Sequence, residues 1–305
     1  MKSHKSVKSK HNKGMKDQDK EQIKQALMAY VTRFDSQGKA SRTLNGVSSA
    51  TISQMLNNRW ELIAEEMWRN VAAQVGYEQT QWKGVQTRDF KLLTALLKDA
   101  QKHSDVFAVI GRAGTGKTYC LKQYAGEHRR SYLLCCNEYW NRKYFLSELL
   151  RTIGVNPGSL TMAEMTTEAV RRLKTQDRPI LILDEADKLK DVVLYFFITL
   201  YNHLENRCAI ILCATDYLRK RLEFGLKRDK KGYPEVWSRI GGKPFKLDGL
   251  SFSDVVQVCS VNGVQDKKSI KEIYNECGRD LRRVRRLVDA FNRGSNDDLN
   301  LYKRP

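Results

Sequence analysis

The feature that most constrains this chain is the string GRAGTGKT at residues 111–118. It matches the pattern G-x-x-x-x-G-K-[ST], follows the apolar run VFAVI and precedes a segment with helical patterning. Glycine at positions 111, 114 and 116 lets backbone N–H groups converge on an anion without clashes from Cβ atoms. A helix that begins at this loop directs its positive end toward the same anion. The string therefore predicts a phosphate-binding loop between a buried strand and a helix.

A second string, ILILDEAD, follows the loop by about 70 residues and completes the expected site. Its apolar residues predict a buried strand with Asp184 at the carboxyl end. We expect ATP as the nucleotide, with Lys117 on its β- and γ-phosphates and with Thr118 and Asp184 holding Mg²⁺. Glu185 is expected to orient and polarise the attacking water. The residues predicted to contact the nucleotide are Gly111, Arg112, Ala113, Gly114, Thr115, Gly116, Lys117, Thr118, Tyr119 and Asp184.

Short apolar strings alternate with helical patterns around these motifs, which is typical of βαβ units in an α/β domain with a parallel sheet. The strings are VFAVIG (106–111), SYLLCC (131–136), PILILD (179–184) and CAIILCA (208–214). After about residue 250 only helical patterns follow. We expect a basic disordered tail (1–16), a helix-turn-helix domain (17–75), a linker (76–90), an α/β ATPase core (91–248) and a helical lid (249–305).

The N-terminal part favours a helix-turn-helix arrangement. Asn45-Gly46 breaks a short helix, Ser48 can cap the next one, and apolar residues at 52, 55 and 56 form its buried stripe. The string GVS-x-x-TIS resembles the turn and recognition helix of phage-repressor domains, which implies DNA contacts. A helical bundle that binds protein is the alternative. The candidate contacts are Ser48, Ser49, Thr51 and Gln54.

Charge and cysteine content limit the partners and the compartment. Lys and Arg number 54 against 35 Asp and Glu, a formal net charge of +19, which favours a nucleic acid partner. The seven cysteines follow no disulfide or zinc spacing, which is typical of reduced thiols in the cytoplasm. The longest mainly apolar run, residues 192–201, is half of the ~20 residues that a membrane span needs, so no membrane association is expected.

The motifs together resemble those of the AAA+ ATPases over roughly residues 85–293. The resemblance rests on the phosphate-binding loop, ILILDEAD, a strand ending in CATD, a late WSRI and a helix beginning GRDLRRV. It implies that Thr215, or else Asp216, senses the γ-phosphate. It also implies that Arg239 acts in the neighbouring subunit's site, with Arg219 and Arg221 as alternatives. Arg282 would reach the nucleotide from the lid, with Arg279 and Arg283 as alternatives.

The order of these parts resembles the phage Mu B-type transposition proteins, with the Tn7-type target regulators and the insertion-sequence helper ATPases as related families. That likeness implies ATP-driven assembly into rings or filaments on double-stranded DNA, activation of a transposase, and release on hydrolysis. It also implies DNA contacts after the second strand, where Arg142 and Lys143 are the candidates. A helicase loader and a nucleotide-gated helix-turn-helix transcription regulator remain the alternative functions.

Overall fold

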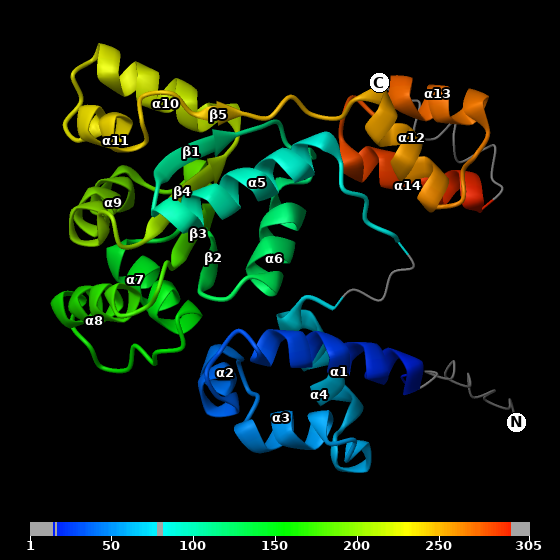
Figure 1. Ribbon diagram of the computed structural model, residues 1–305, viewed down its shortest axis with the longest axis horizontal. Helices are drawn as coiled ribbons and strands as arrows, with labels where there is room; N and C mark the ends of the chain where they lie inside the picture. Colours follow the sequence, from blue (N-terminus) through cyan, green and yellow to red (C-terminus); the bar gives the residue numbers. More distant parts are fainter. Residues whose placement is uncertain (1–14, 16, 78–81, 294–305) are drawn as a thin grey trace, which may run out of the picture. The chain divides into compact units, whose positions relative to one another are not determined.

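The computed structural model describes residues 15, 17–77 and 82–293, and it divides the chain into two compact units, Met1–Thr80 and Gln81–Pro305 (Figure 1). The basic tail expected at residues 1–16 lies outside the described residues except for Met15. Across the described part, none of the helices combines the length and the hydropathy that a bilayer-spanning segment requires.

The first unit is entirely helical within the described residues. Its buried core contains Ile23 and Leu27 of the first helix together with Ile52, Met55 and Trp68. Leu62 is 59% exposed and lies in a short 3-10 helix ahead of the last helix of this unit. The elements are α1 (Asp17–Val31), α2 (Gln37–Thr43), α3 (Ser49–Leu56), η1 (Trp60–Leu62) and α4 (Glu65–Val75).

The second unit is built on a parallel sheet of five strands in the order β2-β3-β4-β1-β5. Four of the strands match the apolar strings of the sequence. The fifth, β5, has only two residues, both exposed, and pairs with β1, so no apolar pattern signals it. The strands are β1 (Val106–Ile110), β2 (Ser131–Cys135), β3 (Ile180–Asp184), β4 (Ala209–Ala214) and β5 (Phe245–Lys246).

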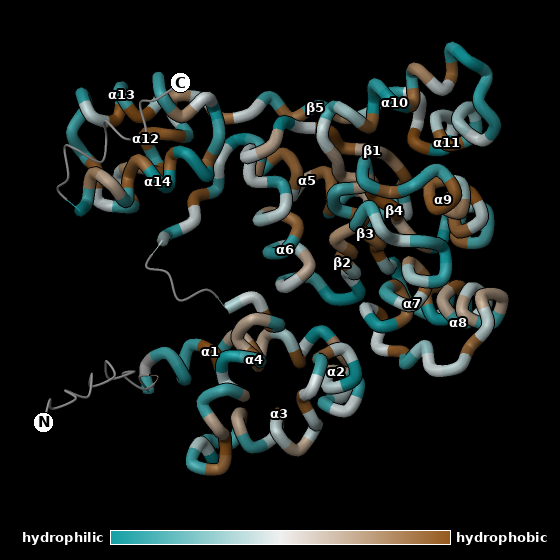
Figure 2. The backbone as a smooth tube through the Cα atoms, turned by 180° about the vertical axis from the view of Figure 1, so that it is seen from behind, coloured by the Kyte–Doolittle hydropathy of each residue, from teal (hydrophilic) through white to brown (hydrophobic). Residues whose placement is uncertain are grey.

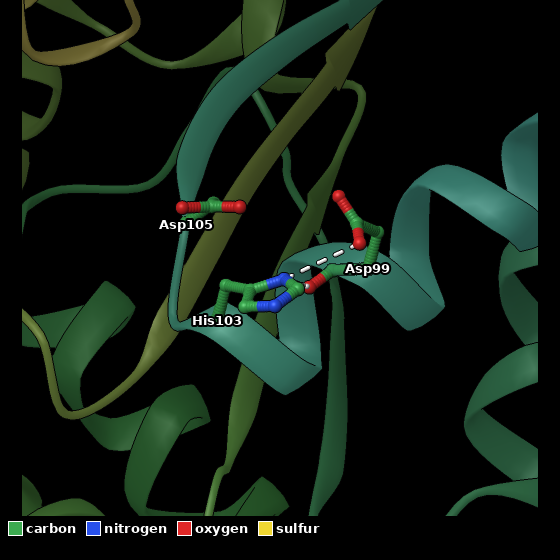
Figure 3. Close-up of side chains that lie close together, drawn as sticks. All are labelled: Asp99, His103 and Asp105. Atoms are coloured by element: carbon green, nitrogen blue, oxygen red, sulfur yellow. Dashed lines mark hydrogen bonds and ion pairs between the residues drawn. The ribbon is translucent and has the colours of Figure 1, made fainter.

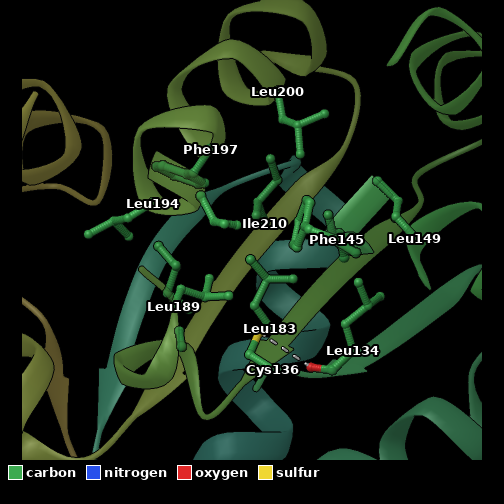
Figure 4. Packing of buried hydrophobic residues seen from close by; sticks show 14 of the residues in the cluster. Leu134, Cys136, Phe145, Leu149, Leu183, Leu189, Leu194, Phe197, Leu200 and Ile210 are labelled. Carbon is green, nitrogen blue, oxygen red and sulfur yellow. Dashed lines mark hydrogen bonds between the residues drawn. The ribbon is translucent and has the colours of Figure 1, made fainter. Parts of the chain in front are cut away.

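Helices cover both faces of this sheet, and successive strand residues serve opposite faces. Ile180 and Ile182 of β3 pack with α5 and α6, whereas Leu181 and Leu183 pack with the helices on the other side (Figure 4). Along these helices apolar stretches alternate with polar ones (Figure 2). The helices are α5 (Arg88–His103), α6 (Lys117–Glu127), α7 (Arg142–Thr152), α8 (Met162–Lys174), η2 (Ala186–Lys188), α9 (Asp191–Leu204), α10 (Asp216–Lys227) and α11 (Tyr233–Arg239).

Three C-terminal helices enclose a core of their own, which includes Val255, Ile270 and Val284. Trp82 and Val85, from the segment expected to be a linker, pack against this core. Helix α5 begins at Arg88, inside the same expected linker, where Thr87 caps it. The C-terminal helices are α12 (Phe252–Val261), α13 (Lys267–Glu276) and α14 (Leu281–Asn292), and they form the lid named below.

Candidate functional site: a phosphate-binding loop at the carboxyl edge of the sheet

The loop between β1 and α6 has the geometry that its glycines permit. Gly114 and Gly116 have φ values of 78° and 89°, in the left-handed region that disfavours side chains. A Cβ atom at Gly114 would lie 2.0 Å from Oδ1 of Asp280, and one at Gly116 would lie 2.9 Å from Leu281. The loop is therefore shaped by backbone conformation and by the close approach of the lid.

Lys117, the first residue of α6, folds back over the loop. Its Nζ donates to the carbonyl oxygens of Gly111 at 2.7 Å and Arg112 at 2.8 Å. Burial lowers the pKa of Lys117, and the charge of Arg282 lowers it further, while nearby acids including Asp184 oppose this. The ammonium group is thus held at the loop, in the position from which it can meet phosphate oxygens.

The Thr118 hydroxyl donates to Asp184 Oδ2 at 2.6 Å, which joins the start of α6 to the carboxyl end of β3. The other carboxylate oxygen accepts from the backbone N–H of Glu185 at 2.9 Å. Asp184 is 1% exposed, and burial raises its pKa although both hydrogen bonds work against the rise. The structure therefore brings together Lys117, Thr118 and Asp184, as the motifs predict.

Glu185 follows β3 in a left-handed conformation, with φ at 55°. Such a backbone is uncommon for a residue with a side chain, and strained residues of this kind gather at functional sites. Its Oε2 pairs with Lys188 Nζ at 2.7 Å, and the hydrogen bond to Glu185 raises the pKa of Lys188. The i,i+3 spacing of Glu185 and Lys188 in the sequence is a signal for this pair.

Thr215 lies at the end of β4 and caps α10. Its hydroxyl donates to Asp187 Oδ2 at 2.5 Å, so β4 and the turn after β3 are joined. Asp216, the alternative sensor, is instead bound by Arg219 of α10 at 2.9 Å. Thr215 is therefore the residue at this strand end that reaches the turn after β3. Asp187 is a further member of the site that sequence reasoning missed.

The lid contacts the loop through the start of α14. Leu281 N–H donates to the carbonyl oxygen of Gly114 at 2.8 Å, and Asp280 caps α14 by accepting from the N–H of Arg282 at 2.8 Å. The charge of Arg282, at the start of α14, contributes to the lowered pKa of Lys117, after the larger effect of burial. Arg283 instead lies near Gly278, where an added Cβ would be 3.2 Å from its Nη1.

Of the remaining predicted residues, Arg239, Arg142 and Lys143 lie away from the loop. Arg239, at the end of α11, stacks over Tyr201 at 4.8 Å and donates to Asn202 Oδ1 at 3.4 Å, so its contacts are with α9. Arg142 Nε donates to the carbonyl oxygen of Val192 at 3.1 Å, and Lys143 is exposed beside it. Tyr119 is 53% exposed, and Arg112 and Ala113 are exposed as well.

In the first unit, the Ser48 side chain accepts from the N–H of Thr51 at 3.0 Å and so caps α3. Ser49 is exposed, and Thr51 and Gln54 are half-buried. The hydroxyls of Ser48 and Thr51 lie 2.9 Å apart, so part of their hydrogen-bonding capacity serves the helix start. The helix and its cap form as the sequence indicates, and contact with DNA stays a prediction for these four residues.

A cluster of possible metal ligands lies at the end of α5, where Asp99, His103 and Asp105 are all exposed (Figure 3). His103 Nδ1 lies 3.2 Å from Asp99 Oδ1, so the pair is explained without a metal ion. Asp105 precedes β1, at the amino end of the strand, away from the phosphate-binding loop. We assign no metal to this cluster.

Residues 100–222, which contain the phosphate-binding loop, match the family model described as AAA domain. Over 256 residues the chain is 23% identical to the Mu-like prophage FluMu DNA transposition protein B of Haemophilus influenzae (strain ATCC 51907 / DSM 11121 / KW20 / Rd), covering 78% of this chain and 85% of that protein. These findings confirm the resemblance and the α/β fold class that the sequence predicts.

A solved structure, that of the Aeropyrum pernix ORC1 protein in complex with DNA, has a similar fold. The TM-score is 0.50 at 17% sequence identity. The match covers 70% of this chain and 63% of the other, so this chain spans less than two thirds of that protein's length. This likeness concerns the fold alone.

Proposed function

We propose that the protein is an ATP-dependent DNA-binding ATPase that assembles on double-stranded target DNA and activates a transposase. In this proposal ATP hydrolysis drives release from the DNA. The single observation that carries the ATPase part is the Thr118–Asp184 hydrogen bond, at 2.6 Å, beneath a glycine loop that also holds the Lys117 ammonium group. Hydroxyl and carboxylate oxygens are ligands that Mg²⁺ prefers, and an ammonium group beside them suits phosphate oxygens.

The residues present fit a magnesium–triphosphate group. The left-handed glycines leave the loop free of Cβ atoms, so backbone N–H groups can face phosphates at the start of α6. Thr118 and Asp184 would hold the Mg²⁺, which when bound neutralises charge on the β- and γ-phosphates. Lys117 would bind the same phosphates from the loop side.

We assign the hydrolytic step to Glu185, which would orient the attacking water and accept its proton. Because the backbone at Glu185 is left-handed, its side chain points in a different direction from the one it would have if β3 continued. This uncommon conformation supports the proposed catalytic role. Thr215, held by Asp187, would sense the γ-phosphate. Arg282 would meet the nucleotide from the lid, and Arg239 would complete a neighbouring subunit's site.

The DNA and transposase parts of the proposal rest on the similarity to the Haemophilus influenzae transposition protein and on charge. Residues 219–246 alone carry ten Lys or Arg against three acids. We propose Arg142 and Lys143 as contacts to the DNA backbone, with Tyr139 and Tyr144 packing beside them. These tyrosines are 60% and 40% exposed, and their ring centroids lie 5.6 Å apart. Ser48, Ser49, Thr51 and Gln54 are the proposed contacts from α3.

The test is negative-stain imaging of the full chain with double-stranded DNA in ATP, in a non-hydrolysable analogue and in ADP. We expect DNA-bound assemblies with ATP and the analogue and dispersal with ADP. Lys117→Ala should bind no nucleotide and form no assembly. A chain that stays monomeric and ignores duplex DNA in every nucleotide state would overturn the proposal. Discrete rings that require a helicase, or sequence-specific dimers, would point to a loader or to a transcription regulator.

A further inference from the structure

We propose that a basic depression at the amino ends of β2 and β3 binds the phosphodiester backbone of double-stranded DNA. This surface is at the edge of the sheet opposite the phosphate-binding loop and is separate from the DNA contacts named above. The inference rests on the proposed DNA binding and deepens it, because it adds a second duplex-binding surface to the same unit.

The depression has a volume of about 300 Å³ and is open to solvent. Its walls come from the last turns of α5 and α6 and from the turns that lead into β2 and β3. The charged residues that line it are Lys98, Lys102, Arg129, Arg130, Arg178 and a single acid, Asp177. Five cations against one acid leave a local charge of 5 − 1 = +4, with the half-buried His128 beside them.

Most of this positive charge is not neutralised within the protein. Asp177 is shared by Arg130 at 3.1 Å and Arg178 at 4.0 Å. Among the described residues, no carboxylate pairs with Lys98, Lys102 or Arg129. The carbonyl ends of α5 and α6 each contribute about −0.5 of a charge, which attracts cations here but offsets only about a quarter of the +4. The remaining charge is available to an external anion.

Hydrogen bonds from Gln101 hold the backbone segments that carry the arginines of the depression. Gln101 Nε2 donates to the carbonyl oxygens of Arg129 at 3.0 Å and Arg178 at 3.1 Å, and its Oε1 accepts from the Tyr124 hydroxyl at 2.7 Å. Arg130 and Arg178 both have left-handed φ values, 60° and 50°. An arginine in an uncommon conformation thus precedes each of two neighbouring strands, and both arginines line the same depression.

The chemistry of the lining favours the backbone of a duplex over single-stranded bases. Proteins that hold single strands present exposed aromatic rings on which bases stack. Here Tyr124 is 2% exposed, and its ring is stacked on His128 with centroids 4.0 Å apart. Guanidinium and ammonium groups without such rings are suited to phosphate oxygens and carry no base preference.

The position of the depression separates it from the nucleotide site. Residues 111–118 and Asp184 follow the carboxyl ends of parallel strands, whereas Arg130 and Arg178 precede β2 and β3 at the amino ends. The same nucleotide cannot serve both sites, so the depression needs an anion of its own. Double-stranded DNA is the anion that the proposed function already supplies.

The test compares two doubly substituted full-length chains. Lys102→Glu with Arg129→Glu changes the depression, and Lys267→Glu with Lys271→Glu changes two exposed lysines of α13. Both variants take the net charge from +19 to 19 − 4 = +15, so overall charge is matched. Binding to a fluorescent duplex of mixed sequence is measured by anisotropy over a salt series with a non-hydrolysable ATP analogue. Affinity for a fluorescent ATP analogue is measured in parallel.

We expect the depression variant to bind duplex on the order of tenfold more weakly than the α13 variant. Its plot of log K against log salt should be shallower by roughly 2, since each lost phosphate contact removes about 0.9. Affinity for the ATP analogue should be unchanged in both variants. Equal duplex affinity and equal salt slopes in the two variants would overturn this inference alone. A wild-type chain that binds no duplex would overturn the proposed DNA binding and this inference with it.

Discussion

At the scale of single residues, the candidate nucleotide site depends on one buried carboxylate. Asp184 is 1% exposed and accepts hydrogen bonds from Thr118 and from the N–H of Glu185. Burial raises its pKa above the usual 3.8, because the ionised form is separated from water. The burial that makes the Asp184 carboxylate a ligand for a divalent cation therefore destabilises the folded protein when no cation neutralises the carboxylate.

We predict that Asp184→Asn stabilises the apoprotein at neutral pH and abolishes Mg²⁺-dependent ATP binding. A raised folded-state pKa means that the folded chain holds this proton more tightly than the unfolded chain. The free energy of unfolding therefore falls as pH rises from 3.8 through the raised pKa. Removing the charge should recover about 1 kcal/mol, or roughly 3 °C in Tm.

Thermal unfolding of the wild type and the variant across a pH series checks this effect. The difference should be largest at neutral pH and should shrink on acidification, as the wild-type carboxyl takes up its proton. A variant that melts below the wild type at neutral pH would show that the two hydrogen bonds to Asp184 outweigh its burial.

Glu185 yields a prediction about turnover. Glu185→Gln keeps the size of the side chain but removes the base, so ATP binding should persist while the hydrolysis rate falls by roughly 10²-fold or more. Phosphate release and nucleotide affinity are the two measurements. Glu138→Gln is the matched control, because Glu138 is another exposed acid whose charge acts on Lys188. Wild-type turnover in Glu185→Gln would remove Glu185 from the proposed role.

At the scale of elements, the start of α14 is placed against the loop that should receive phosphates. A Cβ at Gly114 would lie 2.0 Å from Asp280 Oδ1, so a carboxylate lies beside the loop. Leu281 adds a backbone hydrogen bond to the Gly114 carbonyl oxygen at 2.8 Å. A triphosphate bound at the loop would lie near this like charge, which would oppose its binding.

We therefore predict that Asp280→Asn tightens ATP binding by roughly 1 kcal/mol, or about fivefold. Asparagine is as good an N-cap as aspartate, so α14 should keep its start while the charge is lost. Asp266→Asn is the control, because Asp266 caps α13 in the same way through Ser269. Titration with a fluorescent ATP analogue measures both. Equal affinities in the two variants would show that Asp280 does not oppose the nucleotide.

Elements that carry a strong local sequence pattern could be predicted from the sequence. Contacts between residues that are far apart in the chain could not. Four strands and the phosphate-binding loop follow from apolar runs and glycine spacing. In contrast, β5 has two exposed residues and is defined only by its pairing with β1. The contact between Leu281 and Gly114 joins residues far apart in the chain, so no local pattern reports it.

Within the site, Lys117, Thr118 and Asp184 were predictable because the chemistry fixes their spacing on one strand, one loop and one helix. The bond between Thr215 and Asp187 was not, because it depends on where two neighbouring strands end in space. The effect of the Arg282 charge on the pKa of Lys117 was not predictable either, because it depends on how the lid lies against the loop.

At the scale of the whole molecule, one arginine of the proposed site is not explained within a single chain. Arg239 stacks on Tyr201 and contacts Asn202, away from the phosphate-binding loop. Its Nε is shielded from solvent and has no hydrogen-bond partner among the described residues. These contacts do not test the proposed role of Arg239, which is to act across a head-to-tail contact in which each subunit completes the site of the next.

Mixing two inactive variants tests this arrangement. The Arg239→Ala chain keeps an intact Glu185, and the Glu185→Gln chain keeps an intact Arg239. Where the two variants lie next to each other in the right order, the Glu185 of one chain can therefore act together with the Arg239 of the other. For random head-to-tail assembly of equal amounts on DNA, about one quarter of the contacts pair an intact base with an intact arginine. We therefore expect hydrolysis to recover to roughly a quarter of the wild-type rate, whereas each variant alone stays near background. If imaging shows that the two variants assemble together on DNA but hydrolysis does not recover, Arg239 does not act between subunits. Full activity of Arg239→Ala alone would move the role to Arg219 or Arg221.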